Sequence, residues 1–65
     1  MDLTIGERII AARKRADITQ AGLAGLVGVS LSTMAKIESG RTSPRLELVR
    51  TIAGALGLEY AELVI

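Results

Sequence analysis

The sequence predicts an all-α fold of five helices, and three observations lead to that prediction. Apolar residues recur at spacings of three and four along most of the chain, and no stretch alternates apolar and polar residues as a strand does. Threonine or serine precedes most of these apolar runs and glycine follows them, as at helix starts and ends. The chain has 65 residues, 49% of them apolar and only one aromatic, which suits one small aliphatic core. We therefore expect residues 1–65 to form a single domain.

The first helix is expected at residues 5–15. Thr4 and Glu7 have the spacing of a capping box, in which each side chain accepts a hydrogen bond from the other residue's backbone amide. The residues expected on its buried face are Ile5, Ile9 and Ala12. A short connection at 16–18 follows, and we expect its Ile18 to be buried.

Two short helices joined by a tight turn are expected at residues 20–27 and 31–39. Thr19 and Ser30 each precede one of them, and either hydroxyl can accept from a free amide of the first turn. Gly28 ends the first of the two, because glycine adopts the left-handed conformation found past helix ends without a Cβ penalty. The apolar residues expected to face the core are Leu23, Leu26, Val27, Val29, Met34 and Ile37. Two helices connected in this way form a helix-turn-helix.

The fourth helix is expected to begin at Ser43-Pro44, because proline at the first helical position loses no hydrogen bond and presets φ. Gly57 should end it. The residues expected on its inner face are Leu46, Val49, Ile52, Ala53 and Leu56. A short fifth helix is expected at 59–63, with Tyr60 or Leu63 packed inward.

The composition argues against several classes of function. The chain has no cysteine and no histidine, so it lacks disulfides, zinc thiolates and the commonest general base. No catalytic constellation is visible, and we expect neither an enzyme nor a cofactor. No long apolar run suggests a signal peptide or a membrane span, so we expect a cytoplasmic protein with no membrane partner.

The ordered set of residues from Thr19 to Gly40 resembles the helix-turn-helix of the phage repressor/Cro-type DNA-binding domains. The resemblance extends over nearly the whole chain. The matching positions are Arg13, Gln20, Leu23, Ala24, Val27, Gly28, Val29, Met34, Ile37, Glu38, Gly40, Arg41, Pro44 and residues 52–58. It implies a repressor-like fold in which the helix at 31–39 is the recognition helix and the partner is double-stranded DNA.

By this resemblance, Ser32 and Lys36 match base-contacting positions, and their spacing of four puts them on one face of the helix. Leu31 opens that helix where the family usually has a polar residue, and it can touch a thymine methyl group. The expected phosphate contacts are Gln20, Ser30, Thr33, Arg41 and Arg45, with Ser30 acting mainly as a cap. The alternative is that these are ordinary surface residues, with Arg41 placed beside a helix C-terminus.

Arg13 and Glu38 match positions that form an ion pair in phage repressors of this type. Such a pair would tie the first helix to the end of the recognition helix. The alternative is two independent surface charges.

The function implied is that of a sequence-specific transcriptional regulator that occupies an operator. The resemblance and the apolar residues at 63–65 suggest a two-fold homodimer, formed in solution or only on DNA. A protein-interaction module, such as an antitoxin or a diverged copy with weak DNA binding, is the alternative. Leu31 and Ala35 favour that alternative, because both are less polar than the residues common in the family.

Overall fold

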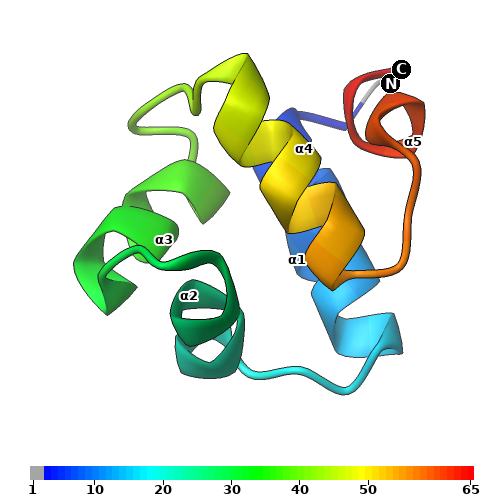
Figure 1. The fold of residues 1–65 in the computed structure, drawn as a ribbon. Helices are drawn as coiled ribbons and strands as arrows, with labels where there is room; N and C mark the ends of the chain where they lie inside the picture. Colours follow the sequence, from blue (N-terminus) through cyan, green and yellow to red (C-terminus); the bar gives the residue numbers. More distant parts are fainter. Residues whose placement is uncertain (1–2) are drawn as a thin grey trace.

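Five helices follow one another in the computed structural model, which describes residues 3–65, and that part of the chain contains no strand. Their bounds are α1 (Ile5–Arg15), α2 (Gln20–Val27), α3 (Leu31–Glu38), α4 (Leu46–Ala55) and α5 (Tyr60–Val64). Figure 1 shows α2 and α3 side by side; α4 packs against α2 and α5, and α1 packs against α3 and α5. The predicted all-α class and helix order are confirmed. Within residues 3–65, no helix has the length and apolar character needed to cross a membrane.

The core draws at least one large, fully buried side chain from every helix. These side chains are Ile9, Leu23, Met34, Ile37, Ile52 and Leu63. Burying one such side chain stabilises a fold by about 1.5–3 kcal/mol, so each short helix is held mainly by its contribution to this shared core. The residues that are half-buried and packed against it include Ile5, Ile18, Val27, Val29, Leu56 and Tyr60.

The predicted helix caps at the first three helices are confirmed. Thr4 and Glu7 form the complete capping box, and Thr19 accepts a hydrogen bond from the Gly22 amide. Gly28 follows α2 with φ of 78°, the left-handed conformation that favours glycine. Thr4 and Thr19 therefore fix where α1 and α2 begin, and Gly28 fixes where α2 ends.

Leu26 was wrongly expected to face the core, because 64% of its surface is exposed. In a helix of eight residues only a narrow stripe meets the neighbouring helices. Leu23 and Ala24 fill that stripe, and Leu26 points away from it. The apolar spacing alone could not separate these neighbours, since both choices fit a period of 3.6 residues.

The start of α4 was also wrongly predicted. Arg45 is its N-cap, in extended conformation, and the helix begins at Leu46 rather than at Pro44. The fixed φ of proline suits extended backbone as well as a first helical turn, and here the loop after α3 uses it. Leu46 stands at the exposed first position, with 51% of its surface accessible, instead of on the inner face.

Two smaller corrections concern helix ends. The third helix ends at Glu38 and not at residue 39, because Ser39 is its C-cap. The fifth helix runs from Tyr60 to Val64, one residue later at each end than expected, since Glu59 is its N-cap and forms a capping box with Glu62.

α1 approaches α3 closely at Gly6, which is buried. A Cβ atom at this position would lie 2.5 Å from the carbonyl oxygen of Glu38 and 2.6 Å from that of Ile37. Only glycine therefore allows α1 to pack directly on the C-terminal turn of α3. Arg13 lies two helical turns after Gly6 on the same face of α1, and its side chain contacts that of Glu38.

Candidate nucleic-acid interface

The outer face of α3 carries exposed side chains at its N-terminal end. Leu31 is 51% exposed, and Ser32 and Lys36 are also exposed, one helical turn apart. Met34 and Ile37 lie on the opposite, buried face. This is the orientation expected from the sequence. Ala35 is half-buried, so it contributes little to this outer face.

Ser30 and Thr33 bond to each other at the start of α3. The Ser30 hydroxyl accepts from the Thr33 amide at 3.0 Å and donates to Thr33 Oγ1 at 3.0 Å. Ser30 therefore caps the helix, as expected. Thr33 is half-buried, and its own hydroxyl proton is not used in this pair.

The exposed charges between Thr19 and Arg45 are all positive, although the whole chain has a net charge of only +1. They belong to Lys36 on α3 and to Arg41 and Arg45 in the loop that follows. The single acid in this segment, Glu38, is 5% exposed. The helix pair and its following loop thus present a positive surface.

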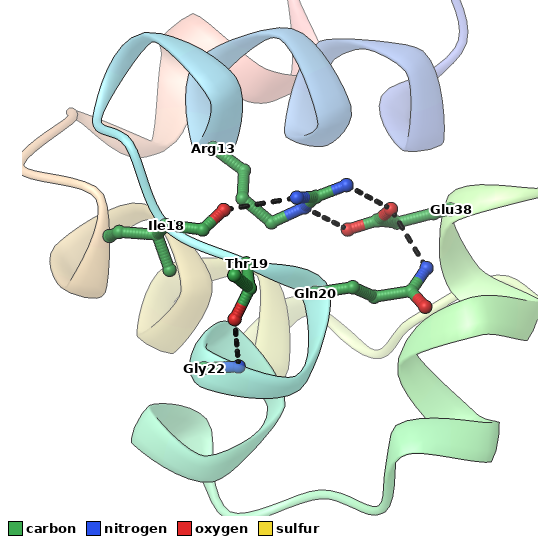
Figure 2. A network of polar contacts seen from close by, with 6 residues as sticks. All are labelled: Arg13, Ile18, Thr19, Gln20, Gly22 and Glu38. Atoms are coloured by element: carbon green, nitrogen blue, oxygen red, sulfur yellow. Dashed lines mark hydrogen bonds and ion pairs between the residues drawn. The ribbon is translucent and has the colours of Figure 1, made fainter.

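Glu38 accepts hydrogen bonds from two other elements of the fold (Figure 2). Arg13 Nε donates to Glu38 Oε2 at 2.9 Å, and Arg13 Nη2 donates to Oε1 at 3.1 Å. Arg13 also donates through Nη1 to the carbonyl oxygen of Ile18 at 3.0 Å. Gln20, the first residue of α2, donates from Nε2 to Glu38 Oε1 at 3.0 Å.

This network joins the end of α1, the start of α2 and the end of α3. The two-pronged contact with Arg13 is the geometry in which an arginine and a carboxylate bind most strongly. Both side chains are largely buried, with exposed fractions of 12% for Arg13 and 4% for Glu38. The reading of two independent surface charges does not fit this geometry.

The third member of the network was missed by sequence reasoning, which considered Gln20 only as a phosphate contact. Its side chain is half-buried and turned toward Glu38. A buried carboxylate can accept about four hydrogen bonds, and a single arginine supplies only some of them. The remaining acceptor sites were the signal that a further donor must lie beside Glu38.

Residues 9–63 match the model of the helix-turn-helix family. The chain belongs to the helix-turn-helix family. It is 40% identical over 62 residues to the immunity repressor protein of Bacillus phage phi105, covering 95% of this chain and 43% of that protein. This helix-turn-helix chain therefore spans less than half the length of that relative.

Two solved structures of the P22 c2 repressor share the fold. The solution structure of its DNA-binding domain has a TM-score of 0.91 at 36% identity, covering 97% of this chain and 84% of that one. The crystal structure of the repressor in complex with synthetic operator 9T has a TM-score of 0.88 at 35% identity, covering 97% and 96%. Both similarities extend over nearly the whole of this chain.

Proposed function

We propose that this helix-turn-helix chain is a transcriptional regulator that binds double-stranded DNA sequence-specifically through α3. One observation carries the proposal: the exposed N-terminal face of α3 lies in a segment whose exposed charges are all positive. An α-helix fits the major groove, where each base pair presents its own pattern of donors and acceptors. The similarity to the P22 c2 repressor, whose structure was solved in complex with a synthetic operator, supports this placement of α3 on DNA.

In this proposal Ser32, Lys36 and Leu31 face the base edges. Lys36 would donate to guanine O6 or N7, and Ser32 can donate or accept. Leu31 would contact a thymine methyl group, and it brings no hydrogen bond of its own. Specificity would therefore depend on Lys36 more than on any other side chain of α3.

Phosphate contacts would come from both sides of α3. Arg41 and Arg45 are exposed in the loop after it, and Thr33 has a hydroxyl proton to donate. Gln20 is the first residue of α2, at the positive end of that helix's dipole, where a phosphate is favoured. Ser30 would contribute mainly by holding Thr33 in place.

The proposed unit on DNA is a two-fold homodimer formed through the C-terminal segment. Leu63 is buried in the core, but Val64 is 38% exposed and Ile65 is 84% exposed. Two copies would place their recognition helices in half-sites one helical turn apart, roughly 34 Å. Footprinting on a selected site tests this: two protected, inverted half-sites are expected, and a single half-site with one protein bound would exclude the dimer.

This role involves binding and no catalysis, and we propose that it is performed in the cytoplasm by residues 1–65 acting as one DNA-binding domain. No cofactor enters the proposal. Among residues 3–65, no group of three acidic side chains is arranged to hold a metal ion.

The test is a titration of labelled duplex DNA at low and moderate salt. Neutralising about 2–3 phosphates per subunit releases counterions, so affinity should fall steeply as salt rises. Lys36→Ala should relax preference at one base pair by about 1–3 kcal/mol. Lys14→Ala is the matched control, since it removes the same charge from an exposed position at the end of α1. No binding at low salt would contradict the proposal and favour a protein-interaction module.

A further inference from the structure

We infer that Glu38 is a positioning residue for DNA binding: it orients the Gln20 carboxamide so that one Nε2 proton remains available to a DNA phosphate. The inference rests on the proposed function, in which Gln20 contacts the DNA backbone. The network described above gives Glu38 a role beyond tying helices together, because one of its three donors belongs to the candidate interface.

The chemistry of the two groups decides which end of Gln20 faces inward. An ionised carboxylate only accepts hydrogen bonds, so it holds the nitrogen of a carboxamide and rejects the oxygen. Gln20 Nε2 lies 3.0 Å from Glu38 Oε1. That nitrogen carries two protons in one plane. One is directed at Glu38 and the other is left for an acceptor elsewhere, and Gln20 is only half-buried.

Arg13 makes this arrangement compatible with a nearby phosphate. A lone carboxylate next to Gln20 would repel the DNA backbone, but the two-pronged contact with Arg13 offsets its charge. The same guanidinium holds the carbonyl of Ile18, directly before the N-cap Thr19 (Figure 2). The start of α2 is thereby placed relative to the end of α3 by partly buried hydrogen bonds.

A purely structural role for Glu38 makes a different prediction. If Glu38 only joined α1 to α3, changing it would alter stability, and any effect on DNA affinity would not depend on Gln20. If Glu38 acts through Gln20, its effect on affinity disappears once Gln20 is gone. The two roles can therefore be separated by a double-mutant cycle on DNA binding.

The sequence makes a direct observation of this carboxamide simple, because the chain contains one glutamine and no asparagine. A ¹⁵N–¹H NMR spectrum therefore contains one side-chain NH₂ pair, from Gln20. We expect one of its two protons to be protected from exchange in the free protein, and duplex DNA to shift mainly the other. Two equally exchanging protons would overturn the inference. So would DNA that moves backbone signals of α3 but leaves both side-chain protons unchanged.

The cycle uses Gln20→Ala, Glu38→Gln and the double variant, each titrated with the same duplex. Glu38→Gln keeps the shape but makes the chain more positive by one charge, which by general electrostatics should tighten DNA binding. We expect the opposite, a weakening of roughly 3- to 10-fold, the effect of one lost hydrogen bond. In the Gln20→Ala background the same change should cause no loss.

Glu47→Gln is the matched control, because it removes one negative charge from an exposed position in the first turn of α4. It should leave affinity unchanged or slightly raised. Circular dichroism at the titration temperature verifies that each variant is folded, and the NMR result stands alone if Glu38→Gln unfolds. An equal loss in both backgrounds would overturn the inference, whereas a wild-type chain that binds no DNA would overturn the proposed function instead.

Discussion

Replacing Gly6 with alanine measures how closely α1 packs on the end of α3. The added Cβ would lie 2.5 Å from Glu38 O and 2.6 Å from Ile37 O, and backbone atoms cannot rotate away as a side chain can. Overpacking of this kind costs about 1–3 kcal/mol, and a helix gains only about 0.5–1 kcal/mol when alanine replaces glycine. Because both contacts are with backbone, we expect an overpacking cost near the upper end of that range, which leaves a net loss of about 2 kcal/mol. In a domain of this size that lowers the Tm by roughly 8–16 °C.

Thermal unfolding followed by circular dichroism provides the measurement, and two other glycines provide the controls. Gly25 in α2 and Gly54 in α4 have no atom within 4 Å of an added Cβ. Alanine at either position should therefore raise stability by about 0.5–1 kcal/mol. A Gly6→Ala variant as stable as the wild type would refute the close packing of α1 on α3.

Three further predictions concern the first cap, the recognition helix and the buried ion pair. Hydrogen bonds from Thr4 hold the pKa of Glu7 below its ordinary value of 4.5. The stability that these bonds contribute is therefore present above pH 4.5 and is lost as the pH falls through the lower pKa of the folded state. The wild type should have a higher Tm than Glu7→Gln at neutral pH, and this difference should shrink on acidification. A difference in Tm that does not change with pH would contradict this role of Glu7. Leu31→Gln should alter base preference and change stability by less than about 0.5 kcal/mol, since Leu31 is 51% exposed, whereas a loss above about 2 kcal/mol would make it a core residue. A double-mutant cycle of Arg13→Met and Glu38→Gln in urea should give a coupling of about 1–3 kcal/mol, and a value of zero would mean the two charges act separately.

The helix starts were predictable where a local chemical signal marks them. Thr4, Thr19 and Ser30 each cap a helix through a hydroxyl that bonds to an amide three residues on, and such pairs are visible in the sequence. The start of α4 has no such signal, because Arg45 makes no side-chain cap bond and Pro44 fits either conformation.

The site was only partly predictable, because its geometry depends on which helices cross. Resemblance to a family indicated Arg13 and Glu38, but periodicity could not show that Gln20 would be the third member. The close approach at Gly6 was missed for the same reason, since a glycine inside a helix resembles any other until its neighbours are known. Leu26 shows the converse case, an apolar residue at helical spacing that no other element covers.

The central claim, that α3 reads DNA sequence, is tested most directly by selecting bound duplexes from a random pool at low salt. The proposed function predicts an enriched motif of two inverted half-sites about one helical turn apart. The same selection with Lys36→Ala should relax preference at one position in each half-site. A wild-type pool that stays random after repeated rounds would contradict the claim.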